Sequence, residues 1–268
     1  LFSEAKKKTK KMSTRRDFFE YLGVGAAALA VPAEAAETSA TRNIMAIAAH
    51  PGDAFFAMGL PLALGAQRGG QCVFFSLTLG GKGSSTIPPA RYGKLQQEAS
   101  ERAASMLKAR ASFLSYPDGE VPVNEEAKFA VCDRIREFKP DIVVTHWRKS
   151  MHKDHMACYQ VVKDAIFYAA LPAFARKLPA HSVSKLFFAD NWEDATDFKP
   201  DTYLDVTPVF DRWSEACAVF PMWRGETGFR YNDYYRSRAI DCGCLSGSKY
   251  AVALMSPPEQ LVRHVQAL

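Results

Sequence analysis

The run Ile44-Met45-Ala46-Ile47-Ala48-Ala49-His50-Pro51-Gly52-Asp53 decides the fold. Its first part is apolar, as expected of a buried strand, and its second part has the polar and turn-forming residues expected of a loop. The same arrangement returns further along the chain, where Ile142-Val143-Val144 precedes His152-Lys153-Asp154-His155. In open α/β sheets, ligands bind at the carboxyl ends of the strands. The two polar motifs are therefore predicted to meet in one site.

Strand and helix patterns alternate from residue 41 onward. Apolar runs bounded by turn residues predict strands, and longer amphipathic runs predict helices. The predicted strands cover residues 43–49, 72–79, 112–116, 141–145, 185–189 and 203–206. The predicted helices cover residues 53–68, 92–109, 124–138, 156–170 and 207–220, the last one capped by Thr207 and Pro208. This order predicts a single Rossmann-like α/β domain of three α/β/α layers, with a parallel sheet and right-handed crossovers.

The amino-terminal segment has the features of an export signal. Residues 13–19 resemble the twin-arginine motif, an apolar run over residues 23–31 follows, and Ala33-Glu34-Ala35 fits a small-residue cleavage site. This apolar run is much shorter than the roughly 20 residues needed to cross a bilayer, so we expect a removable signal and no stable membrane span. The alternative is an amphipathic amino-terminal helix.

We therefore expect residues 1–36 to be the signal with an upstream extension, and residues 37–268 to be the folded domain. The protein is expected to be exported to the periplasm or the exterior. The formal net charge of the 268 residues is +5, and much of it comes from this first segment. Since the rest of the chain is close to neutral, we expect no nucleic-acid-binding surface.

The six cysteines do not by themselves indicate a disulfide framework. Cys72, Cys132 and Cys158 lie within apolar strand or helix patterns and are predicted to be buried small hydrophobic residues. Cys242 and Cys244 are separated by one residue, which is a poor spacing for a mutual disulfide and lacks the second cysteine pair of a structural zinc site.

Three side chains of the two polar motifs form a candidate metal-ligand set. His50, Asp53 and His155 offer two imidazoles and a carboxylate, and catalytic zinc uses such a set while one position stays open for water or substrate. The alternative is that these are hydrogen-bonded loop residues without a metal. Because two such clusters follow matching strand ends, the metal site is the more specific interpretation.

The motifs also resemble those of a known family. Ala49–Asp53 resembles the Ala-His-Pro-Asp-Asp signature of the LmbE-like (PIG-L) zinc-dependent N-deacetylases, and His152–His155 resembles their His-Pro-Asp-His signature. The supporting fragments are Thr78-Leu79-Gly80, Lys82-Gly83, Tyr116-Pro117-Asp118-Gly119, Lys139-Pro140-Asp141 and Tyr203-Leu204-Asp205-Val206-Thr207.

The resemblance implies a role for each matching position. His50, Asp53 and His155 match the family's zinc ligands. His152 matches the histidine that stabilises the tetrahedral oxyanion or protonates the leaving amine, and Asp154 matches the carboxylate that tunes this histidine.

Four further residues are interpreted less specifically. Asp118 matches an aspartate that contacts substrate hydroxyls, although Pro-Asp-Gly is also a common structural turn. His146 follows the second apolar run, and we expect it to support the site without binding zinc. His181 and His264 are expected on the surface.

The chain departs from the family at Gly52, where the family has the aspartate that serves as general base. Glycine cannot accept a proton, and a positioned base is worth roughly 10²–10⁴-fold in rate. Three interpretations are open: His152 with Asp154 carries the proton transfer alone, an acidic side chain from elsewhere fills the space beside Gly52, or the protein binds its ligand without turnover. A second departure is Tyr250–Leu254, where the family often has Tyr-Ala-Glu-Ala-Phe.

The function expected from the sequence is a zinc-dependent hydrolase that removes an N-acyl group, specifically N-acetyl, from an amino sugar or glycoconjugate. The alternative is a catalytically inactive, zinc-retaining carbohydrate-binding protein. The glycine-rich segment 80–85 lacks the spacing of a P-loop and is expected to line the substrate site. Aromatic residues over 213–235 could stack on sugar rings or pack over a sheet edge.

Overall fold

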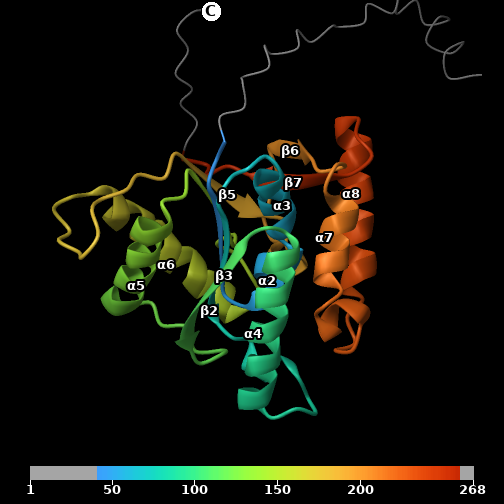
Figure 1. Ribbon diagram of the computed structural model, residues 1–268, viewed down its shortest axis with the longest axis horizontal. Helices are drawn as coiled ribbons and strands as arrows, with labels where there is room; N and C mark the ends of the chain where they lie inside the picture. The colour runs from blue at the N-terminus through green and yellow to red at the C-terminus, as the bar shows by residue number, and fades with distance from the viewer. Residues whose placement is uncertain (1–40, 260–268) are drawn as a thin grey trace, which may run out of the picture. The chain divides into compact units, whose positions relative to one another are not determined.

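The fold is built around a seven-stranded sheet, seen in a computed structural model that describes residues 41–259 (Figure 1). The strands lie in the order β3-β2-β1-β4-β5-β7-β6. Their bounds are β1 Ile44–Ala48, β2 Cys72–Thr78, β3 Arg110–Tyr116, β4 Ile142–Thr145, β5 Lys185–Ala189, β6 Thr202–Asp205 and β7 Ala251–Met255. The proposed export signal and His264 lie outside the described residues.

The first five strands are parallel, as predicted, but the sheet as a whole is mixed. β1 pairs with β2 and β4, β2 pairs with β3, and β4 pairs with β5, all in parallel register. β7 is antiparallel to both β5 and β6 and was missed in the sequence analysis. It returns to the sheet shortly after a helix that ends at Ser246 and has Gly247 as its left-handed C-cap.

Helices cover both faces of the sheet (Figure 1). The helices and short 3-10 turns are α2 Pro51–Phe56, α3 Gly59–Gln67, η1 Gly81–Gly83, α4 Pro89–Met106, α5 Glu125–Phe138, α6 Lys153–Ala170, η2 Trp192–Asp194, α7 Phe210–Cys217, η3 Pro221–Arg224 and α8 Tyr231–Ser246. None of the described helices is long and apolar enough to cross a membrane.

The alternation of side chains along β1 explains the layers. Ile44, Ala46 and Ala48 point into the core that contains α2, α3, α4 and α7. Met45 and Ile47 point into the core that contains α5 and α6. Because successive side chains of a strand face opposite sides of the sheet, this fully buried strand divides the interior into two apolar halves. The three-layer α/β fold predicted from the sequence is confirmed.

Several helix boundaries differ from the prediction. Residues 53–68 form two helices, since Pro61 has no N–H to donate to the preceding turn and the chain breaks at Ala57 and Met58. α4 begins earlier, with Pro89 in its first turn, where a missing N–H costs nothing. α6 also begins earlier, directly after His152.

The carboxyl-terminal helices differ more strongly. α7 begins at Phe210, so Thr207 and Pro208 do not cap it. The Thr207 hydroxyl instead accepts a hydrogen bond of 3.1 Å from the backbone N–H of Tyr250, which ties β6 to the start of β7. α8 was not predicted, because its many aromatic and charged residues obscure the helical period.

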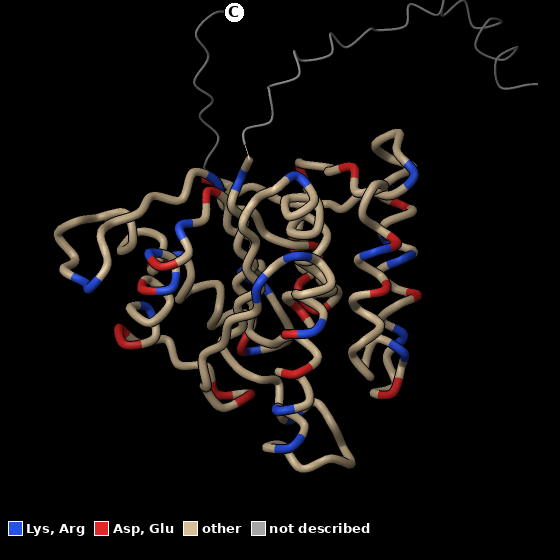
Figure 2. The backbone as a smooth tube through the Cα atoms, viewed as in Figure 1, with Lys and Arg blue, Asp and Glu red and all other residues tan. Residues whose placement is uncertain are grey.

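Charged residues of both signs are interspersed on the helices that surround the sheet (Figure 2). On α5, Lys128 pairs with Glu125 and Arg134 pairs with Glu137, both at a spacing of three residues. Such pairs lie on one face of a helix and stabilise it modestly.

The six cysteines are free thiols. Cys72, Cys132 and Cys158 are buried, as predicted, while Cys244 is exposed. His181 is partly buried rather than on the surface, because its Nε2 lies 2.8 Å from the carbonyl oxygen of Pro140.

One buried cation fixes the end of the helix that carries the second histidine motif. The guanidinium of Arg136 on α5 is 2 % exposed. It donates hydrogen bonds to four carbonyl oxygens at or beyond the carboxyl end of α6, those of Tyr168, Ala169, Leu171 and Leu178. The last carbonyls of a helix have no partner within it, so Arg136 supplies the missing donors.

We expect Arg136→Met to lower the free energy of unfolding by roughly 3 kcal/mol or more, because each buried carbonyl left without a partner costs about 1–3 kcal/mol. Urea denaturation would measure the loss. Arg134→Met on the same helix is the control, since the side chain of Arg134 is 36 % exposed and pairs with Glu137, so its loss should change stability by no more than about 0.5 kcal/mol. Equal stability of the two variants would contradict this assignment.

Candidate metal centre

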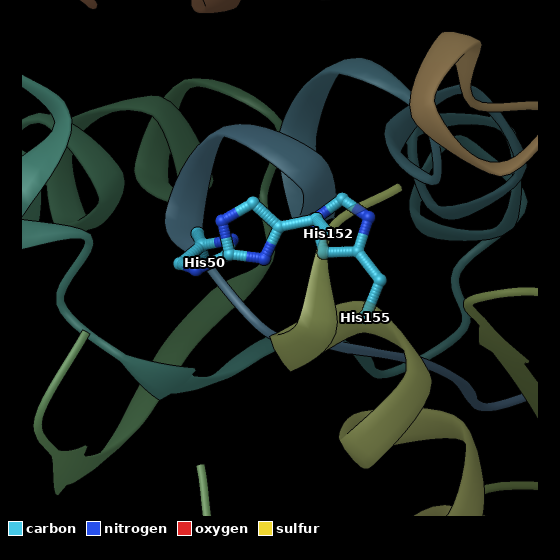
Figure 3. A group of neighbouring side chains, drawn as sticks. All are labelled: His50, His152 and His155. Atoms are coloured by element: carbon cyan, nitrogen blue, oxygen red, sulfur yellow. The ribbon is translucent and has the colours of Figure 1, made fainter. Parts of the chain in front are cut away.

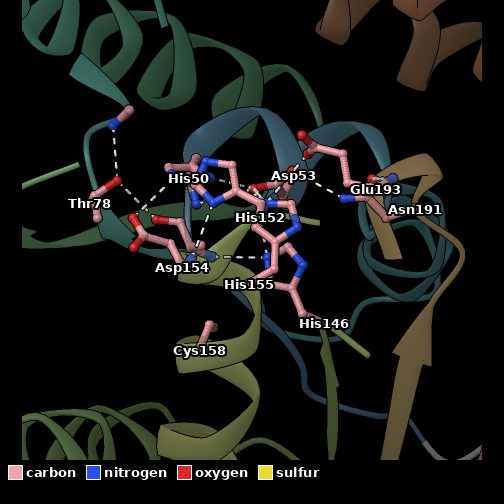
Figure 4. A network of polar contacts seen from close by, with 12 residues as sticks. His50, Asp53, Thr78, His146, His152, Asp154, His155, Cys158, Asn191 and Glu193 are labelled. Atoms are coloured by element: carbon pink, nitrogen blue, oxygen red, sulfur yellow. Dashed lines mark hydrogen bonds and ion pairs between the residues drawn. The ribbon is translucent and has the colours of Figure 1, made fainter. Parts of the chain in front are cut away.

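Loops at the carboxyl ends of three neighbouring strands form the centre (Figure 4). His50 and Asp53 follow β1, His152 and His155 follow β4, and residues 190–194 follow β5. The two histidine motifs therefore meet, as the sequence predicts. The third loop was not identified from the sequence.

Local helix capping sets the positions of His50 and Asp53. His50 is the N-cap of α2, Pro51 takes the first helical position, and Asp53 stands in the first turn. The Asp53 carboxylate accepts a hydrogen bond of 3.3 Å from the backbone N–H of His50, and its Oδ2 lies 2.9 Å from His50 Nδ1. This reciprocal arrangement is a capping box, so a helix start also builds half of the site.

His155 is completely buried and oriented by Asp194. Its Nδ1 donates a hydrogen bond of 2.8 Å to Asp194 Oδ1. Its Nε2 is therefore directed into the site, where it lies 3.1 Å from Asp53 Oδ2 without forming a hydrogen bond. A histidine whose second nitrogen is held by a carboxylate is the usual form of a histidine metal ligand.

His50 has a similar free nitrogen. Its Nε2 lies 3.2 Å from Asp118 Oδ1 and 3.5 Å from Asp154 Oδ2, yet neither contact has hydrogen-bond geometry. Buried polar atoms nearly always have a partner. The unpartnered Nε2 atoms of His50 and His155 in one buried cluster therefore fit a metal ion.

Three overlapping groups of side chains could hold this ion: His50 with His152 and His155, Asp53 with His146 and His155, and His50 with Asp118 and Asp154. Figure 3 shows the three imidazoles of the first group, whose ring centroids lie 4.7 to 5.4 Å apart. Asp53 is close to both His50 and His155, so the predicted set of His50, Asp53 and His155 combines members of these groups.

His146 is not available as a ligand because both of its ring nitrogens are used. Its Nε2 accepts a hydrogen bond of 3.1 Å from the backbone N–H of Ala49, and its Nδ1 donates one of 2.8 Å to Asp194 Oδ2. The ring also stacks on His155 at a centroid distance of 3.9 Å. His146 thus links the end of β1 to the carboxylate that orients His155, in the supporting position expected from the sequence.

The carboxylates make the centre favourable for a cation. Burial alone would raise the pKa of Asp53, but the adjacent His155 and His50 hold it well below its ordinary value. Burial likewise opposes ionisation of Asp194, yet His146 and His155 lower its pKa to about 2. In the absence of a metal, burial disfavours the charged form of His155, but Asp53 and Asp194 raise its pKa to about 10. Both aspartates are therefore ionised at neutral pH.

The β5 loop supplies three contacts to the centre. Asn191 donates a hydrogen bond of 3.2 Å from its side chain to Asp53 Oδ1, and Asp194 binds the two imidazoles. Glu193 Oε2 lies 3.6 Å from His155 Nε2. Burial, followed by the charge of Asp53, raises the pKa of Glu193 to about 7. The sequence signal for this loop was the same as for the other two, since polar residues follow a predicted parallel strand.

The His152 ring has a defined tautomer when neutral. Its Nδ1 accepts a hydrogen bond of 3.2 Å from the backbone N–H of Asp154, so the proton is on Nε2. Burial first, and then the neighbouring His50 and His155, lower the pKa of His152. His152 therefore offers an N–H donor on the side that faces the cavity.

Asp118 and Asp154, the two other aspartates predicted for the site, also accept hydrogen bonds from loop backbone N–H groups. The Asp154 carboxylate accepts hydrogen bonds from the backbone N–H groups of Gly119 and Val121, at 2.7 and 3.2 Å. It makes no side-chain hydrogen bond to His152 among the described contacts, so its effect on that ring is through charge alone. Asp118 accepts a hydrogen bond of 2.7 Å from the Lys82 N–H and lines the cavity through its other oxygen.

A cavity of about 500 Å³ opens beside the candidate ligands. Residues Gly80, Lys82 and Gly83 line it, as expected for the glycine-rich loop. One wall is aromatic and consists of Phe56, Trp192, Phe229, Tyr231 and Tyr235. Trp192 and Phe229 stack with centroids 4.5 Å apart.

The aromatic carboxyl-terminal third therefore divides between two roles. Trp213, Phe220 and Trp223 are buried in the core, where Trp213 donates a hydrogen bond of 2.7 Å to the carbonyl of Phe55 on α2. Phe229 and Tyr231 line the cavity instead. The packing interpretation is confirmed for the first group, while stacking of the second group on a sugar ring stays a prediction.

Gly52 lines the cavity, and a methionine packs closely against it. A Cβ placed on Gly52 would lie 3.3 Å from both Sδ and Cε of Met222, and 3.4 Å from a ring carbon of Phe56. Gln96 donates a hydrogen bond of 3.3 Å to the same sulfur. The atoms nearest to a Cβ at this position thus come from Met222, which η3 carries, and from Phe56, and none of them is acidic.

We expect Asp194→Asn to weaken zinc binding about 10–100-fold, the usual cost of losing a partner that orients a ligand. Asparagine can accept from only one of the two imidazole N–H groups, so one ring loses its orientation. Competition with a chromophoric chelator would measure the affinity. Asp197→Asn is the control, since Asp197 is in the same loop but exposed and paired with Lys149. Unchanged affinity in Asp194→Asn would show that this carboxylate does not orient the ligands.

Comparison with known proteins places this site in context. The family model described as PIG-L, GlcNAc-PI de-N-acetylase, matches residues 45–166, which contain both histidine motifs. The chain is 22 % identical over 180 residues to 4-oxalmesaconate hydratase of Pseudomonas putida, covering 64 % of this chain and 70 % of that protein.

Two solved structures share the fold. The 4-carboxy-2-hydroxymuconate hydratase GalB from Pseudomonas putida matches with a TM-score of 0.73 and 20 % identity, covering 85 % of this chain and 99 % of that one. The N,N'-diacetylchitobiose deacetylase from Pyrococcus horikoshii matches with a TM-score of 0.71 and 18 % identity, covering 96 % and 98 %. The family match therefore assigns residues 45–166, with both histidine motifs, to the PIG-L/LmbE-like deacetylase family, and the solved structures show that the fold is shared.

Proposed function

We propose that this protein is a zinc-dependent hydrolase that removes an N-acyl group, specifically N-acetyl, from an amino sugar or glycoconjugate. The observation that carries the proposal is the pair of buried, unpartnered Nε2 atoms of His50 and His155 in a cluster of carboxylates. The His155 nitrogen lies beside the ionised Asp53, and the His50 nitrogen lies beside Asp118 and Asp154. Its family model is named for a de-N-acetylase, and a similar structure is a deacetylase of an acetylated sugar.

His50, Asp53 and His155 would hold the metal. Zinc bound there would polarise the amide carbonyl and lower the pKa of water. One carboxylate and two imidazoles are a ligand set that suits zinc. The hydrogen bond from His155 to Asp194 orients the His155 imidazole as expected of a metal ligand.

His152 would stabilise the oxyanion that develops on the carbonyl. Its Nδ1 is occupied by the backbone N–H of Asp154, so a neutral ring presents its Nε2–H to the cavity. A donor directed at developing negative charge strengthens as the transition state forms. This geometry favours hydrogen-bond donation by His152 over its use as the proton source for the amine.

The cavity suits a sugar ring. The stacked Trp192 and Phe229 offer an apolar face to the C–H side of a pyranose, and Asp118 offers a carboxylate oxygen to a hydroxyl group. We also propose that the protein acts outside the cytoplasm, a proposal that rests on the twin-arginine motif in residues 13–19 alone.

A second candidate reaction is the addition of water to a carbon–carbon double bond. It is favoured by the absence of the family's base at Gly52 together with the similarity to a hydratase. The non-catalytic carbohydrate binder remains the third candidate. All three would bind zinc at the same residues, so only assays of turnover separate them.

We expect the zinc-loaded protein, from Ala36 onward, to release acetate from at least one member of a panel of N-acetylated sugars. His155→Ala should abolish release through loss of a ligand, and His152→Ala should lower kcat about 10²–10³-fold through loss of an oxyanion donor. His181→Gln is the control, since His181 contacts only Pro140 and should leave the rate unchanged.

No acetate release together with hydration of 4-oxalmesaconate would establish the second candidate. Sugar binding with bound zinc and no turnover of either substrate class would establish the third. Enzyme-coupled detection of acetate and isothermal titration with the same sugars distinguish these outcomes.

A further inference from the structure

We propose that Glu193 is the catalytic base of this enzyme and takes the proton from the attacking water. This inference rests on the proposed function, because it requires water to attack an acyl carbonyl, but it does not require the acyl group to be on a sugar. It names a carboxylate that the sequence motifs do not identify and that lies on a different loop from Gly52.

The position of Glu193 is fixed by its backbone while its carboxylate is left unbound. Its N–H donates a hydrogen bond of 3.1 Å to the side chain of Asn191, and its carbonyl accepts one of 3.0 Å from Met151. The side chain lines the cavity, is 19 % exposed and makes no hydrogen bond among the described residues. Figure 4 shows it on the opposite side of Asp53 from His50.

The other carboxylates around the centre already contact neighbouring protein groups through both of their oxygens. Asp194 binds two imidazoles, one with each oxygen. Asp154 binds the N–H groups of Gly119 and Val121, one with each oxygen. Asp118 is bound to Lys82 through one oxygen and lies against His50 with the other.

Asp53 is the remaining acid, and it is the candidate metal ligand. It contacts His50, His155 and Asn191. Among the described carboxylates of this centre, Glu193 is thus the one with both oxygens available to a small molecule. Its Oε2 is also 3.6 Å from the nitrogen of His155 that would face the metal, so it is within reach of a water in that space.

Met222 explains why the base is on η2 rather than at position 52. Its sulfur and terminal carbon fill the space that a side chain at residue 52 would enter. A carboxylate there would have to displace Met222 and break the hydrogen bond from Gln96. Glu193 approaches from the other side and meets no such obstacle.

The proposed reaction involves only the substrate, one water molecule and the Glu193 carboxylate, and every proton is accounted for. The oxygen of water forms a bond to the carbonyl carbon, and one water proton passes to the Glu193 carboxylate. The carbonyl oxygen becomes an oxyanion that accepts a hydrogen bond from His152. The carbon–nitrogen bond then breaks, and the proton on Glu193 passes to the departing nitrogen, which leaves as a neutral amine while the acid remains as product.

The experiment compares Glu193→Gln with the wild-type chain in two assays. The first measures zinc affinity by chelator competition. The second measures hydrolysis of 4-nitrophenyl acetate by the zinc-loaded protein, which needs water activation but no recognition of a sugar. Glu226→Gln is the matched control, since Glu226 is exposed, is not among the cavity-lining residues and pairs with Arg224.

We expect Glu193→Gln to keep zinc affinity within about threefold and to lower kcat about 10²–10⁴-fold with KM little changed, because a base acts in the transition state. The control should retain both properties. A loss of zinc affinity in Glu193→Gln would overturn the proposal by showing that Glu193 is a ligand. A wild-type hydrolysis rate in this variant, or no hydrolysis by the wild-type chain, would overturn it as well.

A rescue variant adds an independent test. In the Glu193→Gln background, Met222→Ala with Gly52→Asp opens the space beside residue 52 and places a carboxylate there, and we expect it to recover part of the lost rate. If the wild-type chain hydrolyses the ester through Glu193 but releases no acetate from any sugar, Glu193 remains the base and the proposed substrate class is wrong.

Discussion

The hydrogen bonds from two buried imidazoles to the carboxylate of Asp194 are the interaction on which the centre depends. His146 and His155 each donate from Nδ1, at 2.8 Å, to separate oxygens of this one side chain. The bond to His155 directs its free nitrogen into the site, and the bond to His146 lets that ring accept from the end of β1. One carboxylate thus aligns loops from three adjacent strands.

Burying so many polar side chains lowers stability unless each has a partner. The low dielectric of the protein interior strengthens hydrogen bonds, and it also raises the free-energy cost of an unpaired polar group. Asp194, His146 and His155 are all completely buried. Two nitrogens, Nε2 of His50 and Nε2 of His155, are the exceptions in this cluster. The first lies beside Asp118 and Asp154, and the second lies beside Asp53. Most polar atoms of the network therefore have hydrogen-bond partners without a ligand. The two nitrogens that have none are suited to bind a cation.

The carboxyl-terminal third of the chain completes the site from the other side. α7 is held to α2 through the buried hydrogen bond from Trp213 to Phe55, and η3 then places Met222 against Gly52. The next residues turn Phe229 and Tyr231 towards the cavity. The packing of the core and the shape of the cavity are consequently coupled. Gly52 belongs to this packing because Met222 lies against it, so the position differs from the family by more than the loss of a carboxylate.

The sequence by itself determined the strands β1 to β5, the alternation with helices and the two loops that carry His50, Asp53, His152 and His155, because apolar periodicity and capping residues are local signals. Only the tertiary structure decided that the β5 loop joins them, that β7 is antiparallel, and that Met222 occupies the space beside Gly52. These features join residues distant along the chain, such as Asn191 and Asp53, which are 138 positions apart. Such contacts follow from strand order and crossover path, which leave no pattern in the neighbouring residues.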